Sequence, residues 1–263
     1  MQIGWFSTGR DEEARKLLES VLVERQRGLS LDIAFVFCNR ERGESPVTDS
    51  FLDYAKSQGL KTITRSSMKF MPELRLLRRE LWREEYHKEV WKLIKDYEVE
   101  FSFLAGYMLI VGRSLIEHHR MLNLHPAVPG GPKGSWQEVM WELIKKRAHY
   151  AGAQIHLVTA ELDEGPAVTF CQFSLKTPEF EPLWRRFEED LLTMSLEEIK
   201  ETYKEDYPLF RKIREEEFIR EIPLIIMTLK RLSEKGLNLE EIKKGGIDLS
   251  EEVERYINIT KRV

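Results

Sequence analysis

Residues 101–126, FSFLAGYMLIVGRSLIEHHRMLNLHP, contain two apolar runs separated by a loop and a short helical segment. The run FSFLAG is almost continuously apolar, which is typical of a strand buried on both faces of a parallel sheet. MLNLH predicts the next strand, and residues 114–119 predict a helix between the two. A strand, a crossing helix and a second strand form the unit from which parallel sheets are built.

The chain before this stretch repeats the same alternation. An apolar strand at residues 3–6 leads into the turn Ser7-Thr8-Gly9-Arg10 and then into a helix, for which Asp11 is the expected N-cap. Further strands are predicted at 31–39 and 61–65, and further helices at 49–59 and 72–97. We therefore predict the α/β class, with a Rossmann-like domain built on a largely parallel central sheet.

The pattern changes at Thr177. Before it, a helix is predicted over 136–146 and two strands over 151–160 and 167–175. Beyond it the strand signals stop, and amphipathic helical patterns continue toward the end of the chain. We expect a first domain over residues 1–176, which contains the candidate catalytic residues, and a helical C-terminal extension over residues 177–263.

Composition argues against several classes of partner. The 263 residues include 41 Lys and Arg and 45 Asp and Glu with the signs interspersed, so nothing points to nucleic acid or to an anionic membrane. No apolar run approaches the roughly 20 residues that span a bilayer, and the first residues do not resemble a signal peptide. Cys38 and Cys171 lie in apolar runs and are expected to be buried free thiols in a cytoplasmic protein.

Three polar residues suggest acyl-transfer chemistry. Asn123 and His125 are two positions apart, so their side chains lie on the same side of an extended backbone, just where a strand ends. An amide and an imidazole can stabilise an oxyanion and move a proton, and Asp163 in the turn ELDEGP can orient His125 or raise its pKa. The alternatives are a polar turn before Pro126 and an Asx turn at Asp163.

The motifs LAGYM, NLHP, Lys133-Gly134 and HLVTAELDEGP occur in this order within residues 83–166. Together they resemble the glycinamide ribonucleotide formyltransferase family, and His156 matches the histidine of that family's H-x-V-T strand. The resemblance implies that Asn123, His125 and Asp163 form the catalytic triad. It also implies 10-formyltetrahydrofolate as co-substrate, a phosphorylated small-molecule amine as acceptor, and no metal.

The resemblance further implies two binding segments. The folate would contact mainly backbone groups of the segment closing LAGYM and of the turn before Asp163, together with a family arginine that matches Arg83. The residues concerned are Arg83, Met108, Leu109, Ile110, Val111, Thr159, Ala160, Glu161 and Leu162. The acceptor's phosphate would bind at Thr8, Gly9 and Arg10, although the family's G-x-G-S-N turn is here replaced by Gly9-Arg10-Asp11-Glu12-Glu13. For Arg83 the alternative is a solvated helix face of paired charges.

Several alternatives remain open. A formyltetrahydrofolate hydrolase uses a similar triad, and a formyltransferase acting on a sugar nucleotide or on methionyl-tRNA is another candidate, as is a folate- or nucleotide-binding protein without activity. Arg214 or Arg220 of the extension is a second candidate for binding the acceptor's phosphate, and the extension can instead build a homodimer. Glu117, His118 and His119 are adjacent but point to different faces of a helix, so we predict no metal site.

Overall fold

The strands form one sheet in the computed structural model, which describes residues 1–236, 242 and 245–260. The strand order is β3-β2-β1-β4-β5-β6-β7-β8. The pairs β1–β2, β1–β4, β2–β3, β4–β5 and β7–β8 are parallel, which confirms the largely parallel sheet. The strands are β1 (Gln2–Ser7), β2 (Asp32–Cys38), β3 (Thr62–Thr64), β4 (Phe101–Leu104), β5 (Met121–His125), β6 (Tyr150–Leu157), β7 (Ala167–Ser174) and β8 (Ile247–Asp248).

The direction of the chain across the sheet reverses at β1. From β1 the chain continues to β2 and β3 on one side, and it returns to place β4 on the other side. In open parallel sheets, ligands bind at the carboxyl ends of the strands at such a switch point. The loops that follow β1 and β4 are held together there, because the Thr8 N–H donates to Gly106 O at 3.0 Å and the Met108 N–H donates to Thr8 Oγ1 at 2.8 Å.

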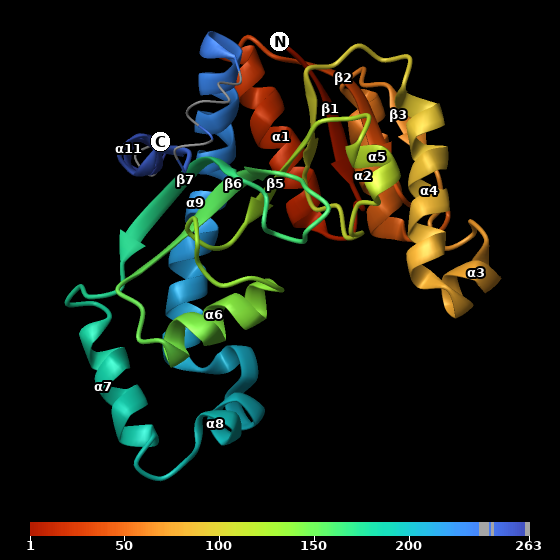
Figure 1. Ribbon diagram of the computed structural model, residues 1–263. Helices are drawn as coiled ribbons and strands as arrows, with labels where there is room; N and C mark the ends of the chain where they lie inside the picture. Colours follow the sequence, from red (N-terminus) through yellow and green to blue (C-terminus); the bar gives the residue numbers. More distant parts are fainter. Residues whose placement is uncertain (237–241, 243–244, 261–263) are drawn as a thin grey trace. The chain divides into compact units, whose positions relative to one another are not determined.

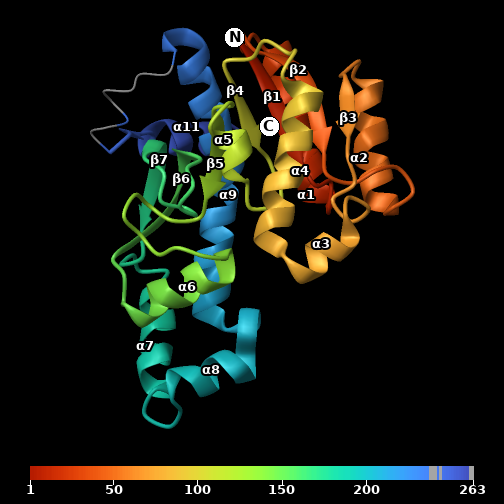
Figure 2. The same cartoon turned by 45° about the vertical axis from the view of Figure 1, so that its right-hand side comes forward.

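The chain divides into two compact units, of which the first comprises residues 1–123, 156–165 and the described residues of 229–237. Its aromatic core joins Phe6 and Phe37 of the strands to Tyr86 of α4 and to Tyr107. Figure 1 shows β1, β2 and β3 side by side, and Figures 1 and 2 both place α5 next to α4. The helices are α1 (Glu12–Gln26), α2 (Pro46–Ser57), α3 (Pro72–Leu77), α4 (Arg79–Ile94) and α5 (Arg113–Ile116).

The single helix predicted over 72–97 is wrong, because the chain breaks at Arg78 into α3 and α4. Arg78 has φ −145° and ψ 67°, outside the helical region. Trp82, Tyr86, Val90 and Ile94 form a buried stripe at four-residue spacing along α4, whereas α3 buries none of its residues. The apolar stripe that stabilises α4 therefore does not continue into α3, and charge-rich composition alone did not reveal this.

The second unit comprises residues 124–155, 166–228 and the described residues of 238–263. Its core joins Trp141 of α6 to Phe187, Tyr207 and Phe210, and in Figure 1 α6, α7 and α8 gather around the first part of α9. The helices are α6 (Trp136–Lys145), α7 (Glu181–Asp190), α8 (Leu196–Tyr203), the 3₁₀ turn η1 (Lys204–Asp206), α9 (Pro208–Lys235) and α11 (Ser250–Thr260).

The C-terminal region is helical as predicted, with one correction. Strand signals were expected to stop at Thr177, but Ile247 and Asp248 form the short strand β8, which pairs with β7. A two-residue strand is too short to show a period in the sequence. Residues 237–241, 243–244 and 261–263 of the predicted extension lie outside the described residues.

Two other expectations concern the whole chain. Cys38 and Cys171 are buried free thiols, as predicted, and burial raises the pKa of Cys38 to about 11 and that of Cys171 to about 12. In the part of the chain that the structure describes, every helix is too short or too polar to traverse a bilayer.

Two buried histidines make the stability depend on pH. Burial lowers the pKa of His87 and of His119 to about 4, against about 6.5 in an unfolded chain. The unfolded state therefore binds these protons first as the pH falls, so the stabilisation is complete above pH 6.5 and is lost toward pH 4. We expect the unfolding free energy to fall by about 2 kcal/mol per histidine between pH 7 and pH 5. Urea titrations of the wild type and of His119→Gln measure this, and an equal fall in both proteins would contradict the assignment to His119.

Candidate active site

Asn123 and Asp163, two of the predicted catalytic residues, meet at a third residue in the first unit. The amide Nδ2 of Asn123 lies 3.3 Å from Nε2 of His156, and the same imidazole nitrogen lies 3.9 Å from Oδ1 of Asp163. Only 3% of the His156 side chain and 10% of the Asp163 side chain are exposed. Because both distances are measured from one ring nitrogen, the amide and the carboxylate converge on a single protonatable atom.

The hydrogen bonds of His156 indicate which ring nitrogen carries the proton. Its Nδ1 lies 3.0 Å from the carbonyl oxygen of Leu157, which can only accept, so Nδ1 is the protonated nitrogen in this contact. In the neutral ring Nε2 then accepts a hydrogen bond from the Asn123 amide. A second proton on Nε2 would turn the contact with Asp163 into an ion pair. A proton on this nitrogen would therefore lie beside a carboxylate.

The turn that carries Asp163 is tightly constrained. Asp163 has φ +56°, in the left-handed region that Asp and Asn tolerate better than most residues. Thr159 Oγ1 donates to the carbonyl of Glu161 at 3.0 Å, and the Glu164 N–H donates to the same carbonyl at 3.3 Å. The turn from Thr159 to Leu162, predicted to contact the folate, is thus ordered by its own hydrogen bonds while Leu162 stays half exposed.

Gly165 sets how closely this turn approaches β6. A Cβ atom built at Gly165 would lie 1.6 Å from the Leu157 carbonyl oxygen and 3.2 Å from Nδ1 of His156. We therefore expect Gly165→Ala to displace the Leu157 carbonyl that holds His156, and to lower the unfolding free energy by about 1–3 kcal/mol. Urea denaturation measures this change, with Gly59→Ala as the control, since Gly59 has open space around it and its substitution carries only the cost of its positive φ. A Gly165→Ala variant no less stable than Gly59→Ala would contradict the close approach.

His125, the third predicted catalytic residue, belongs to the second unit. It ends β5, two residues after Asn123, and only 3% of its surface is exposed. Its Nε2 lies 2.9 Å from the Pro132 carbonyl oxygen, so Nε2 is the protonated nitrogen in this contact. The loop that supplies this carbonyl turns at Gly130, where φ is +76°, and ends in a capping box between Ser135 and Glu138 at the start of α6. The backbone of this loop therefore fixes the orientation of the imidazole.

The turn of α4 that contains Arg83 is bonded to residues on both sides of the predicted folate segment Met108–Val111. His87 Nε2 lies 3.2 Å from Tyr107 Oη, and the Gly112 N–H donates to His87 Nδ1 at 3.2 Å. The Glu84 carboxylate accepts the N–H groups of Arg113 and Ser114 at 3.0 and 2.9 Å, and these hydrogen bonds lower its pKa although its burial acts in the opposite direction. The two predicted folate elements are thus held together.

Within this arrangement the predicted folate residues differ in exposure. Met108 and Ile110 are exposed by 50% and 43%, whereas Val111 is buried. The side chain of Arg83 is only 19% exposed and pairs with Glu80 at 2.7 Å. A ligand reaching Arg83 would therefore have to compete with an exposed carboxylate, whose ion pair contributes little in water.

The predicted phosphate loop already uses several of its donors. The Gly9 N–H donates to Ser7 Oγ at 3.1 Å, and Gly9 has φ +56° with the Phe51 ring 2.9 Å from where a Cβ would lie. Asp11 caps α1 as predicted, accepting the Ala14 N–H at 3.1 Å. The Arg10 side chain is 55% exposed and pairs with Asp11 at 3.1 Å. A phosphate bound here would compete with the Asp11 carboxylate, which already occupies the N-terminus of α1.

The alternative phosphate ligands of the extension are also paired. Arg214 contacts both Glu217 and Glu221, and Arg220 contacts Glu216 at 2.8 Å and Glu254 at 2.6 Å. Among the described residues, no group of three or more His, Cys, Asp or Glu side chains is placed to hold a metal ion.

Sequence reasoning gave His156 no role, although the structure places it between Asn123 and Asp163. The available signal was a histidine in the strand QIHLV, next to Ile155, which is fully buried. A buried polar side chain in such a strand requires partners. Those partners are 33 residues earlier and seven residues later in the chain, so a local pattern does not reveal them.

Comparison with known proteins gives a consistent result. The model of the family described as formyl transferase matches residues 5–177. A curated relative, the phosphoribosylglycinamide formyltransferase of Escherichia coli (strain K12), is 25% identical over 171 residues, which are 64% of this chain and 70% of that protein. The chloroplastic phosphoribosylglycinamide formyltransferase of Arabidopsis thaliana is 31% identical over 118 residues, which are 43% of this chain and 37% of that protein.

Solved structures share the fold. The crystal structure of phosphoribosylglycinamide formyltransferase from Bacillus halodurans matches with a TM-score of 0.57 and 18% identity, covering 91% of this chain and 98% of that one. This likeness extends well beyond residue 177, so it includes part of the helical C-terminal region.

Proposed function

We propose that this chain, which belongs to the formyl transferase family, transfers a formyl group from 10-formyltetrahydrofolate to the amine of glycinamide ribonucleotide. Family membership rests on the match over residues 5–177, and the acceptor is suggested by the curated relatives, which are phosphoribosylglycinamide formyltransferases. The reaction would then be a step of purine synthesis. The structural observation that supports it best is the convergence of Asn123 and Asp163 on buried His156.

In the proposed mechanism the acceptor's amine attacks the formyl carbon, and the carbonyl oxygen becomes an oxyanion. Asn123 donates a hydrogen bond to this oxygen, and His125 in its protonated form stabilises the negative charge. The amine's proton passes to the folate nitrogen as its bond to the formyl carbon breaks, with His125 and Asp163 as the proton carriers. The Pro132 carbonyl supports this role of His125, because it holds one ring nitrogen and so fixes the direction of the other.

Arg83, the segment Met108–Val111 and the turn Thr159–Leu162 would bind the folate. The hydrogen bonds of His87 and Glu84 support this assignment, because they hold Arg83's turn of α4 against residues 107–114. We assign the acceptor's phosphate to Thr8, Gly9 and Arg10, with Arg10 exchanging its contact with Asp11 for the phosphate.

The catalytic domain is assigned to residues 1–176, which the family match over 5–177 supports, and the helical extension to residues 177–263. A cytoplasmic location agrees with two buried free thiols, which persist in a reducing compartment. A homodimer built on the extension, without nucleic acid or membrane as a partner, remains part of the proposal.

The test is formyl transfer measured with 10-formyltetrahydrofolate and glycinamide ribonucleotide, beside a reaction without acceptor. Turnover that depends on the acceptor is the expected result. Equal turnover without acceptor would replace the proposal by the hydrolase reaction, and turnover only with a sugar nucleotide amine would replace the acceptor. A protein that binds the folate but turns over none of these substrates would contradict the proposed activity.

A further inference from the structure

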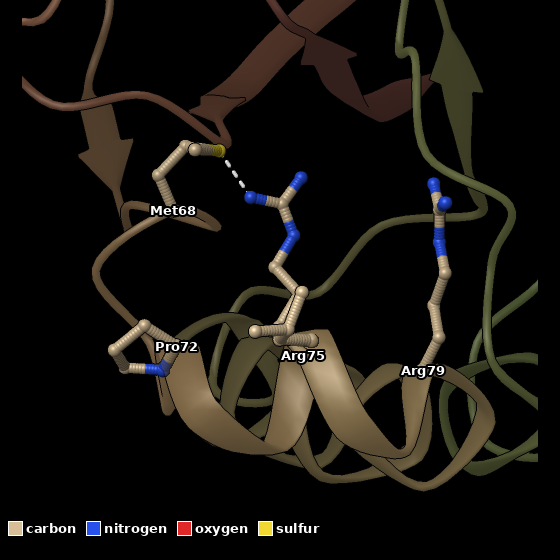
Figure 3. Close-up of a pocket in the computed structure, with 5 residues that line it drawn as sticks. Met68, Pro72, Arg75 and Arg79 are labelled. Atoms are coloured by element: carbon tan, nitrogen blue, oxygen red, sulfur yellow. Dashed lines mark hydrogen bonds between the residues drawn. The ribbon is translucent and has the colours of Figure 1, made fainter.

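His87 lies on α4, one helical turn after Arg83, and its side chain is fully buried. At its start α4 lies beside a surface pocket, shown in Figure 3, which is lined by Met68, Pro72, Arg75, Leu76 and Arg79. His87 is not one of these residues. Its contacts are instead with the two residues that flank the predicted folate segment Met108–Val111.

A single imidazole holds both ends of this segment. Tyr107 comes immediately before the segment, and its Oη lies 3.2 Å from His87 Nε2. Gly112 comes immediately after the segment, and its N–H donates to His87 Nδ1 at 3.2 Å. The imidazole is a rigid ring, and buried hydrogen bonds of this kind make their surroundings rigid when they are satisfied. The ring therefore fixes the separation of the two ends and with it the path of the backbone between them.

The neighbours of the ring indicate which nitrogen carries the proton. Nδ1 lies 2.9 Å from the Arg83 carbonyl oxygen, which can only accept, and it also faces the Gly112 N–H, which can only donate. A proton on Nδ1 would remove the acceptor of the buried Gly112 N–H, which is costly, whereas the Arg83 carbonyl keeps its helical hydrogen bond in either case. We therefore place the proton on Nε2, which donates it to Tyr107 Oη.

The hydrogen bonds continue beyond Tyr107 in the same direction. The Tyr107 side chain is hydrogen-bonded to that of Tyr86, and Tyr86 Oη donates to the Arg65 carbonyl oxygen at 2.6 Å. When His87 donates from Nε2, the Tyr107 hydroxyl proton is available for Tyr86, so each group donates to the next. Chains of this kind strengthen their members cooperatively. Burial lowers the pKa of His87 to about 4, so the ring is neutral near pH 7 and the chain is intact there.

From this geometry we propose that His87 is a positioning residue of the folate site, which holds Tyr107 and Gly112 so that the backbone of Met108–Val111 is presented to the co-substrate. The inference rests on the proposed function, because it assigns His87 a role in the proposed folate site. In this role the imidazole touches neither the folate nor the acceptor. Its loss should therefore weaken folate binding and leave the formyl transfer step intact.

The test compares His87→Phe with His119→Phe. Both histidines are buried in the first unit and burial lowers the pKa of each to about 4, but His119 contacts Ser102 of β4, at 2.6 Å, and not the folate segment. We expect His87→Phe to bind tetrahydrofolate at least about tenfold more weakly in calorimetry, because the Gly112 N–H loses its acceptor. His119→Phe should bind it as the wild type does. In both variants kcat and the KM of the acceptor should stay within about twofold of wild type.

Three further measurements distinguish positioning from a loss of stability. His87→Asn should recover most of the lost affinity, because the amide oxygen can take the place of Nδ1 and accept the Gly112 N–H. Amide hydrogen exchange without ligand should become faster at residues 108–112 in His87→Phe but not in His119→Phe. Nitrogen-15 NMR of the wild-type ring should show the proton on Nε2.

The outcomes separate this inference from the proposed function. Wild-type folate affinity in His87→Phe, an equal loss in His119→Phe or no recovery in His87→Asn would overturn the inference alone. A ring proton on Nδ1, or unchanged exchange at residues 108–112 in His87→Phe, would do the same. A kcat that falls together with the affinity would contradict a positioning role. If the wild type bound no tetrahydrofolate, the proposed function would fail and this inference with it.

Discussion

Replacing His125 by alanine is expected to lower kcat for formyl transfer by at least about a hundredfold, because general acid–base catalysis by a positioned side chain contributes roughly 10²–10⁴-fold. The imidazole is almost fully buried and one of its nitrogens is held by the Pro132 carbonyl, so its orientation is fixed. The measurement is initial rate at saturating folate and acceptor. Both KM values should change much less than kcat, because the proposed role of His125 is exerted mainly in the transition state.

His118→Ala is the matched control for this variant. His118 is an exposed histidine that stacks on Trp91 at 5.7 Å and has no role in the proposed mechanism, so its loss should leave kcat unchanged. Circular dichroism and a urea titration establish that His125→Ala is folded. If folded His125→Ala retained wild-type kcat, His125 would be only the polar residue of the turn before Pro126, and the proton carrier would have to be sought at His156.

The order of the elements was predictable because each is encoded by a local pattern. Apolar runs of strand length alternate with helical patterns up to residue 176, and this alternation is confirmed by the largely parallel sheet. The N-cap of α1 at Asp11 was predicted for the same reason, since its capping partner is the nearby N–H of Ala14. Features that depend on neighbouring residues in the chain are therefore visible in the sequence.

The features that escaped prediction depend on contacts between distant segments. The helix break at Arg78 follows from where the buried stripe of α4 ends, which is determined by packing against β1 and β2 rather than by the residues around Arg78. The role of His156 depends on β5 and β6 being neighbours in the sheet. The use of the Gly9 N–H by Ser7 depends on the backbone conformation of one turn. Each of these features depends on tertiary contacts or on backbone conformation, and the spacing of sequence motifs predicts neither.

Substitutions of Asp163 distinguish most clearly between a catalytic and a structural role of this residue. Its backbone is in the left-handed region, and asparagine tolerates this conformation nearly as well as aspartate does. Asp163→Asn therefore removes the charge beside His156 Nε2 while keeping the turn and the volume of the side chain. We expect kcat to fall by about a hundredfold or more in this variant, with an unfolding free energy close to that of the wild type.

Asp163→Ala is the companion variant, because alanine removes the charge and also disfavours the left-handed backbone. It should lose about 1 kcal/mol more unfolding free energy than Asp163→Asn, and its kcat should be at least as low. If the aspartate served only to shape an Asx turn, the order would be different: Asp163→Asn would keep full activity and Asp163→Ala alone would lose it. The pair of variants thus decides whether the carboxylate charge or the turn is what formyl transfer requires, and a fully active Asp163→Asn would remove Asp163 from the proposed mechanism.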